Sequence, residues 1–271
     1  MSTAMNASEA TPADRTTWLN QLRSGHLSRP YDCYNMDLNR ADLQGADLSH
    51  TRFARASLPQ AILANANLSG ADLRGADLRG AVLQQVNLQG ACLYRADLSG
   101  ADLTGANLEN AQFDLARYDR HTRFPDGFAY PSSGAIGPRA NLNGAPLNTA
   151  NLRNADLQDV RLIGAYLTGA DLTGANLQGA RLTNADLRKA FLTGASLRHA
   201  GLNGANLEQA DLRATDLTGV EFDHLEAMAG ADFSLSQGLT EMQRTYLLNQ
   251  GDRPLDTWNA FTRQTTRMSL A

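Results

Sequence analysis

The side chains that could carry out chemistry in this chain are its histidines, cysteines and carboxylates. Two cysteines and five histidines are spread along the sequence. None of them has the spacing that would hold zinc or activate a cysteine nucleophile. The phosphate-binding type of glycine-rich loop is also missing from the sequence. We therefore expect no metal, no cofactor and no catalytic residue. The histidines are His26, His50, His121, His199 and His224.

Aspartates stand directly before a leucine at many points, as at Asp72, Asp77 and Asp171. Paired carboxylates are common agents of general acid–base catalysis. Here they recur in step with a five-residue repeat, which is typical of solvated wall positions that hydrogen-bond locally. The pattern predicts a protein that is not an enzyme.

The repeat is a bulky apolar residue at spacing five, which occurs thirty-four times between Met36 and Phe222. At about 100° per residue, an α-helix would scatter these residues around its circumference. In a straight strand, the odd spacing would send successive ones to opposite faces. The chain must therefore turn a corner within every repeat.

The residue two before each apolar centre points the same way as the centre, as strand alternation requires. It is Ala in twenty-eight repeats, so both positions are predicted to face the core. The corner falls two residues after the centre, where Gly stands fifteen times and Asn also appears. Both types tolerate a positive φ.

A typical unit is Ala71-Asp72-Leu73-Arg74-Gly75, or A-(D/N)-L-x-G in general. In tandem this pattern resembles the pentapeptide-repeat proteins. The resemblance implies an all-β fold, a right-handed quadrilateral parallel β-helix with four repeats to a coil. It also implies that residues one coil apart, about twenty along the chain, become neighbours. Neither a metal nor a disulfide is implied.

The composition indicates a cytoplasmic protein with no membrane contact. The net charge is −4, and the first ten residues contain no Lys or Arg, so no signal or transit peptide is evident. No apolar run approaches the length of a membrane span. Cys33 and Cys92 lie about three coils apart in the predicted fold, too far for a disulfide, so we expect two free thiols.

The chain divides into five predicted pieces, with a helix in the first and in the last. Thr11 followed by Pro12 reads as a helix start, and this helix should run to about Ser24. Thr240 and Gln243 have capping-box spacing and should begin the second. Both helices are interpreted as caps on the open ends of the β-helix. The pieces are 1–35 (helix and cap), 36–118 (first array), 119–139 (interruption), 140–222 (second array) and 223–271 (helix, cap and tail).

The segment 119–139 interrupts the register. Centres 118 and 142 are twenty-four residues apart, one short of a whole number of repeats. The segment is rich in Pro and Gly, which are typical of turns. We predict about one coil of chain with an outward loop, in which Phe124 or Phe128 replaces a leucine in the core.

The C-terminal piece should contact the β-helix through its apolar side chains. The second helix is predicted to place Met242, Tyr246 and Leu247 on one apolar side. Trp258 and Phe261 stand in an otherwise polar tail. We expect these rings to pin the tail to the β-helix or to a twin subunit, so a homodimer through this segment is one prediction.

Some pentapeptide-repeat proteins mimic DNA and protect type II topoisomerases such as gyrase, and this is the alternative function for the chain. The first array carries nine acids against seven arginines, and the second carries eight acids against seven bases. These small net charges are poorly suited to imitating phosphates. Because the bases are interleaved with acids, direct binding of nucleic acid is not expected either.

Stacking residues about one coil apart identifies the side chains on the outer walls. Ile62 over Val82 forms an apolar patch where Asp or Asn would be ordinary, and Tyr94 is expected around the corner with Cys92. The adjacent wall is predicted to carry a structural asparagine ladder. In the second array, apolar and aromatic residues point outward and two arginines stack. The candidate contact residues are Ile62, Val82, Tyr94, Arg161, Ile163, Tyr166, Arg181 and Phe191.

Clustered apolar residues on a regular wall are typical of a contact surface. The alternative is that the tail covers them through Trp258 and Phe261. We predict a non-enzymatic scaffold that binds a protein partner of unknown identity. The resemblance to cyanobacterial members, one of which regulates heterocyst differentiation by binding other proteins, implies a regulatory role.

Overall fold

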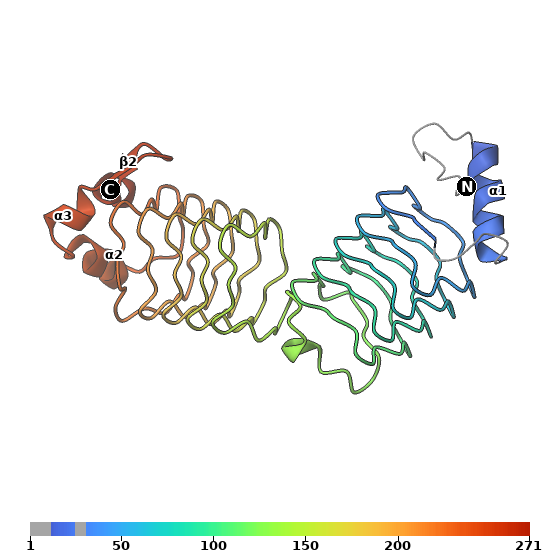
Figure 1. Ribbon diagram of the computed structural model, residues 1–271. Coiled ribbons are helices and arrows are strands. Elements are labelled where there is room, and N and C mark those ends of the chain that lie inside the picture. Colours follow the sequence, from blue (N-terminus) through green and yellow to red (C-terminus); the bar gives the residue numbers. More distant parts are fainter. Residues whose placement is uncertain (1–11, 25–30) are drawn as a thin grey trace. The chain divides into compact units, whose positions relative to one another are not determined.

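The computed structural model describes residues 12–24 and 31–271, and the chain forms two compact units. The first unit is Met1–Ile136 and the second is Gly137–Ala271. Figure 1 shows each unit as a stack of coils with few helices. The division between the units falls inside the predicted interruption.

Each unit is a parallel β-helix, as predicted. Isolated parallel bridges join residues one coil apart, such as Ile62 with Val82 and Arg161 with Arg181. Backbone hydrogen bonds accompany every bridge; the Leu43 amide donates to the Ile62 carbonyl at 2.8 Å, and the Ile62 amide donates to the Ala41 carbonyl at 2.9 Å. These bonds satisfy the backbone amides and carbonyls within each unit, so neither a metal nor a disulfide is needed to hold neighbouring coils together.

The interior is built as the sequence predicted. Leu73 and Ala71 are at most 1% exposed, and the other centres and small positions are buried in nearly every repeat. Each corner is a tight turn: the Ala76 amide donates to the Leu73 carbonyl at 3.0 Å, and Gly75 has a φ of 64°. Corners without glycine adopt the same conformation, as at Lys189 with a φ of 57°. The repeated turn is therefore strong enough to impose a positive φ on ordinary residues.

The residue before each centre points outward and stacks in a column, which we name after one member. The first unit has the Ile62, Asn67, Cys92 and Asp77 columns in chain order, and the second has the Arg161, Tyr166, Phe191 and Asp156 columns. The three columns that carry most of the argument are the Ile62 column (Asp42, Ile62, Val82, Asp102, Arg123), the Arg161 column (Asn141, Arg161, Arg181, Gly201, Glu221) and the Tyr166 column (Pro146, Tyr166, Asp186, Asn206, Ala227).

The helix α1, Pro12–Arg23, lies against the first coils. Leu22 is fully buried, and the Arg23 guanidinium pairs with Asp42 at 2.7 Å. This helix was predicted, although Thr11, where it was expected to start, lies outside the described residues. The bridge between Asp32 and Arg52 shows that pairing begins ahead of the predicted first array.

The interruption rejoins the coil stack and carries an aromatic cluster. Arg123 bridges to Asp102, so Phe124 takes the place of a leucine next to it, one of the two substitutions that we predicted. The rings of Phe124 and Phe128 are half-buried and both contact the buried Phe113 ring, with centroids 6.3 and 5.3 Å away. Tyr130 opens the short 3-10 helix η1, Tyr130–Ser132, and stacks on Phe124 at 5.1 Å.

Pairing in the second unit continues beyond Phe222. Bridges join Asp211 to Asp232 and Asp216 to Gln237, so the isolated Ala231-Asp232-Phe233 of the sequence belongs to a further coil. The helix α2, Glu241–Leu248, follows and begins with the predicted capping box. After it come α3, Asp252–Leu255, the antiparallel strands β1, Trp258–Asn259, and β2, Gln264–Thr265, and α4, Thr266–Leu270.

One side chain of α2 differs from the prediction. Leu247 is buried and the Tyr246 ring packs on Phe222 with centroids 5.9 Å apart, but Met242 is 83% exposed. The helix contacts the coil below through Gln243 instead, whose Nε2 donates to the Val220 carbonyl at 2.7 Å. The apolar side of α2 therefore comprises Tyr246 and Leu247 and does not include Met242.

Candidate functional site

The outer columns display the side chains that a partner could contact. Within one repeat the aspartate before the centre serves the fold first: Oδ1 of Asp72 accepts the backbone amide of Arg74 at 3.2 Å and closes a local turn. Such residues are structural, as the sequence indicated. A side chain that is available to a partner should therefore stand at a column position that does not close this local turn.

The asparagine ladder is confirmed as a structural element of the first unit. Nδ2 of Asn67 donates to Asp47, that of Asn87 donates to Asn67, and that of Asn107 donates to Asn87, at 3.1 to 3.2 Å. Each amide links two coils, so this column is occupied by its own hydrogen bonds.

Ile62 and Val82 stack in one column, as predicted. Ile62 is 39% exposed and Val82 is half-buried. Their polar neighbours in the column are already engaged: Asp42 pairs with Arg23, and Asp102 accepts Nε2 of Gln84 at 2.8 Å. The pair is therefore a small apolar patch between satisfied acids.

The prediction that Tyr94 lies around the corner from Ile62 is wrong. Tyr94 follows the Cys92 column, and that column is separated from the Ile62 column by the whole asparagine ladder. The Tyr94 ring stacks instead with the guanidinium of Arg95, which is 5.1 Å from the ring centroid. The error came from the order of the columns around a coil, since Cys92 is two repeats beyond Val82.

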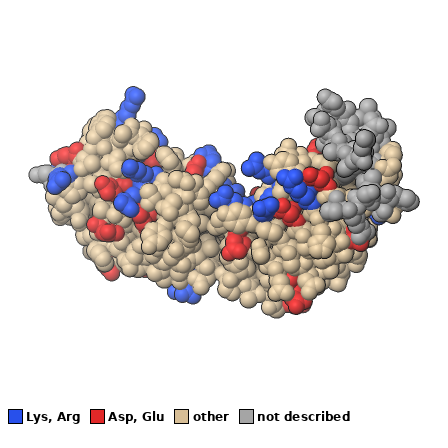
Figure 2. Space-filling view, viewed as in Figure 1, with Lys and Arg blue, Asp and Glu red and all other residues tan. Residues whose placement is uncertain are grey.

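Most acids on the outer columns are paired with arginines. Asp72, Asp77, Asp186 and Asp211 each bind the arginine two residues later through both carboxylate oxygens, at 2.6 to 2.8 Å. The hydrogen bonds from Arg188 lower the pKa of Asp186 to about 2. Figure 2 shows the resulting mixture of basic and acidic side chains on one face.

Arg161 and Arg181 differ from these paired arginines. They stack one above the other in the Arg161 column, as predicted, and both are exposed. Neither forms a salt bridge or a side-chain hydrogen bond with any described residue. Next in the column, Gly201 has no side chain, and the place where a Cβ would stand is open space. Two unpaired positive charges therefore face solvent side by side.

Tyr166 stands in the neighbouring column and is 54% exposed. It bridges to Pro146, which is also exposed, so an apolar row runs beside the two arginines. Ile163 lies between the two columns and is half-buried. The structure thus brings Arg161, Ile163, Tyr166 and Arg181 together, and it adds Pro146, which was not among the predicted contact residues.

Phe191, in contrast, is removed from this surface by the C-terminal segment. Its ring makes an edge contact with Phe261 at 5.8 Å. The segment is anchored beside it by Asn259, whose Nδ2 donates to the Gly230 carbonyl at 2.8 Å, and by Gln209, whose Nε2 donates to the Trp258 carbonyl at 3.1 Å. The prediction that the tail is pinned to the β-helix is confirmed for Phe261, which docks on Phe191, whereas the Trp258 side chain is 55% exposed.

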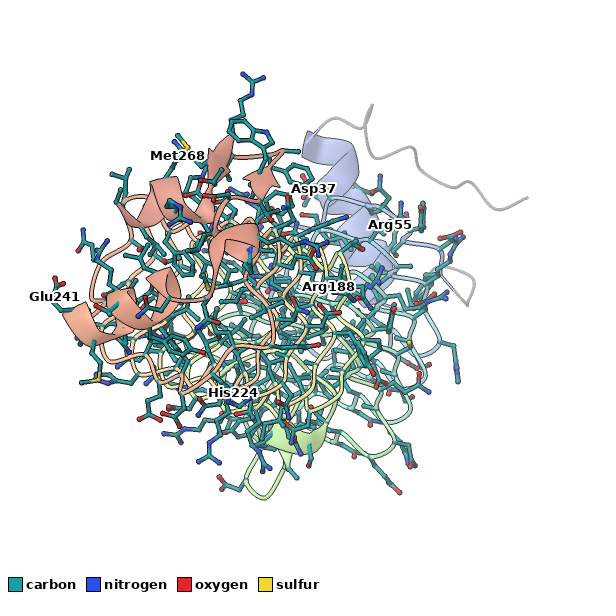
Figure 3. The ribbon with its side chains drawn as sticks, turned by 90° about the vertical axis from the view of Figure 1, so that its left-hand side faces the viewer. Asp37, Arg55, Arg188, His224, Glu241 and Met268 are labelled. Atoms are coloured by element: carbon teal, nitrogen blue, oxygen red, sulfur yellow. The ribbon has the colours of Figure 1, made fainter. Side chains whose placement is uncertain are left out.

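The C-terminal elements expose large apolar side chains of their own. Trp258, Phe261 and Met268 are each more than half exposed, and Leu235 is 82% exposed. Figure 3 shows Met268 and Glu241 projecting outward at the edge of the molecule. Sequence reasoning singled out only the two aromatic residues.

Groups that could support metal or thiol chemistry are few. Within residues 12–24 and 31–271, no three His, Cys, Asp or Glu side chains gather closely enough to hold a metal ion. Cys33 and Cys92 are free thiols, as predicted, and burial raises the pKa of Cys33 to about 12. None of the helices in the described part of the chain has the length and apolar character to cross a membrane.

Comparison with known proteins gives one family. A model of pentapeptide repeats (8 copies) matches residues 37–75, 61–100, 81–117, 139–174, 150–188, 175–213 and 190–224. These matches cover more than half of the chain. A search of curated proteins finds no match.

Several solved structures are similar to this chain. HetL, a pentapeptide repeat protein involved in heterocyst differentiation regulation from the cyanobacterium Nostoc sp. strain PCC 7120, is 30% identical over 86% of this chain and 100% of its own, with a TM-score of 0.36. Rfr23 from the cyanobacterium Cyanothece 51142 is 39% identical over 36% of this chain and 67% of its own, with a TM-score of 0.35. QnrB1, a plasmid-mediated fluoroquinolone resistance protein, is 20% identical over 77% and 96%, with a TM-score of 0.24.

Proposed function

Because the chain belongs to the pentapeptide-repeat family, we propose that it is a non-enzymatic, regulatory scaffold that binds a protein partner through side chains on the outer columns. The surfaces we assign to this role are the Ile62–Val82 patch, Tyr94, and the group formed by Arg161, Ile163, Tyr166 and Arg181. Phe191 is left out because Phe261 covers it.

The observation that carries the proposal is the exposure of large apolar side chains in the columns. Tyr166 is 54% exposed and Ile62 is 39% exposed, although the fold needs only a polar or small residue at these positions. Neither side chain belongs to the buried core. Aromatic and apolar groups of this kind are enriched at the centres of protein interfaces, where they bury area on binding.

The charges favour a protein-binding scaffold over a DNA mimic of the topoisomerase-protecting kind. A mimic needs carboxylates that present uncompensated negative charge to a basic groove. Here Asp72, Asp77 and Asp186 each hold an arginine at 2.6 to 2.7 Å. The charge of each aspartate is neutralised by its own arginine, so these columns do not present a row of phosphate-like groups.

Partner capture tests the scaffold function. The full chain is immobilised and exposed to native lysate, and bound proteins are identified by mass spectrometry. We expect Tyr166→Asp or Ile62→Asp to remove a specific partner, because a new charge in an apolar contact must be desolvated. The control is Gln112→Asp, which adds the same charge at an exposed column position of the first unit.

The result would contradict the proposal if capture were unchanged in both apolar variants while their thermal unfolding matched that of the parent. A supercoiling assay with purified gyrase distinguishes the scaffold from the alternative function, a DNA mimic that protects a topoisomerase. A scaffold should leave supercoiling and drug poisoning unchanged, whereas a DNA mimic should alter one of them.

The proposal also includes the two ends of the chain. We assign α1 and α2 as end caps, supported by the burial of Leu22 and by the bond from Gln243 to the Val220 carbonyl. We place the protein in the cytoplasm, as a monomer or as a homodimer through the C-terminal segment, where Trp258 is 55% exposed. Cell fractionation and sedimentation velocity test these two assignments.

A further inference from the structure

We propose that Arg161 and Arg181, together with Pro146, Ile163 and Tyr166, form a docking site for an acidic, extended segment of a protein partner. This site, the arginine–tyrosine patch, rests on the proposed scaffold function and names the chemistry of the partner.

The two arginines are an unfavourable pair in the free protein. Arg161 and Arg181 bridge directly, so their Cα atoms are separated by about one strand spacing, ~4.8 Å. Like charges opposite each other on neighbouring strands destabilise a sheet. Two other exposed arginines on the coils of the second unit are neutralised, Arg153 by Asp171 at 3.0 Å and Arg198 by Asp216 at 3.1 Å.

The acids nearest to the patch in sequence do not relieve this repulsion. Asp159 stands at the corner before Arg161, and Glu221 lies two places beyond Arg181 in the same column. Neither forms a salt bridge with the arginines. Because Gly201 separates Arg181 from Glu221 and adds no side chain, the guanidinium of Arg181 is open on that side. Carboxylates from a partner would satisfy both arginines.

The apolar row indicates a peptide and not a simple anion. Tyr166 bridges to Pro146 in the adjacent column, and Ile163 lies between this row and the arginines. An extended segment that runs parallel to these two columns could place carboxylates on the arginines and an apolar side chain on Tyr166. Arginine and tyrosine are also the residues that most often dominate interface energetics.

A nucleic acid fits this surface less well than a protein segment. The chain carries a net charge of −4, and Asp156, Asp159 and Asp186 lie within one coil of the patch. A phosphate polymer would extend past the two arginines over these acids and be repelled. A short acidic segment keeps its charge on the patch. The C-terminal segment leaves the patch free, since it docks at Phe191 and Gln209 while Tyr166 stays 54% exposed.

The test measures binding of fluorescein-labelled hexaglutamate to the full chain by fluorescence anisotropy at low salt. We expect saturable binding that weakens as salt is raised, because exposed charge pairs are screened. The double variant Arg161→Gln/Arg181→Gln should bind roughly tenfold more weakly, the order expected for two lost charge-assisted contacts. Tyr166→Ala should weaken binding of the peptide Glu-Glu-Leu-Glu-Glu more than that of hexaglutamate.

The matched control is Arg153→Gln/Arg198→Gln, which removes the same charge from the same unit but from arginines that already have acid partners. Unfolding curves of all variants establish that they fold. The proposal is overturned if hexaglutamate does not bind, if both double variants lose affinity equally, or if an oligothymidylate of equal charge binds more tightly. If a partner is captured from lysate and the Arg161→Gln/Arg181→Gln variant still captures it, the scaffold function stands and this site is wrong.

Discussion

Gly238 directly follows Gln237, the last residue in the parallel bridges of the second unit, and cannot be replaced by a residue with a side chain. Its φ is +87°, and a Cβ built on it would lie 2.5 Å from the Cα of Thr218 on the preceding coil. That neighbour is backbone and cannot rotate away. Gly194, in the same unit, has a φ of +67° but open space where its Cβ would stand.

We therefore expect Gly238→Ala to destabilise the second unit far more than Gly194→Ala does. The Gly194 variant should cost only about 1–2 kcal/mol, the usual penalty for an alanine in the left-handed region. Gly238→Ala adds a backbone clash to that penalty. Urea unfolding at equilibrium measures both, and equal losses would show that the coils can separate to admit a methyl group.

The Asp186–Arg188 pair makes stability depend on acidity. Hydrogen bonding from Arg188 lowers the folded pKa of Asp186 to about 2, below the ordinary value for aspartate. A group with a depressed folded pKa stabilises the protein above its unfolded pKa, and this stability is lost as pH falls toward the folded pKa. The loss belongs to the window from about pH 4 down to about pH 2.

Between those pH values, Asp186→Asn should lose less stability than the parent, because the variant has no carboxylate to protonate there. Unfolding free energies measured at several pH values test this. Asp126→Asn is the control, since Asp126 is exposed and has no partner among the described residues. The idea fails if the two asparagine variants show the same dependence on pH.

At the scale of elements, α2 is held at its first turn by a capping box. The Thr240 hydroxyl accepts the Gln243 amide at 3.2 Å, and Oε1 of Gln243 accepts the Thr240 amide at 3.0 Å. The same Gln243 side chain also donates to Val220 on the coil below. One residue thus begins the helix and attaches it.

Thr240→Ala should cost about 1 kcal/mol, the typical value for a lost N-cap. Thr245→Ala, at an exposed position of the same helix, should be close to neutral or slightly favourable because Ala is the better helix former. Hydrogen exchange of α2 amides, together with thermal unfolding, measures the difference. No difference between the two variants would mean that α2 is held by Leu247 and Tyr246 alone.

At the scale of the whole molecule, each of the two units is a one-dimensional stack in which a coil pairs with its neighbours. Such proteins respond locally to damage, because stability is close to a sum of repeat and nearest-neighbour terms. The division into two compact units strengthens this expectation. Leu73 and Leu172 are equivalent, fully buried centres in the first and second unit.

Leu73→Ala should therefore speed hydrogen exchange throughout the first unit and leave the second nearly unchanged, and Leu172→Ala should do the reverse. Each should cost about 2–5 kcal/mol in its own unit, the usual range for a buried leucine truncated to alanine. Exchange followed by mass spectrometry resolves the units. If either variant accelerated exchange equally in both units, the chain would be one cooperative body.

The sequence alone determined the repeating part of this protein. Spacing five excludes both regular periods, so the corner, the buried leucine and the outward aspartate follow from backbone geometry repeated many times. Column neighbours such as Arg161 with Arg181 and Asn67 with Asn87 could be predicted as soon as the coil length was known. Repetition turns a weak local preference into a strong one, since every unit must agree with its neighbours.

Only the tertiary structure decided what happens where the repetition stops. That Phe261 covers Phe191 and that Met242 faces solvent depend on contacts between segments that share no period. The absence of ion pairs at Arg161 and Arg181 likewise depends on the tertiary structure. Side-chain length and rotamer decide which nearby carboxylate a guanidinium can contact. Sequence periodicity specifies neighbours within a column but carries no information on which side chains other segments cover or neutralise.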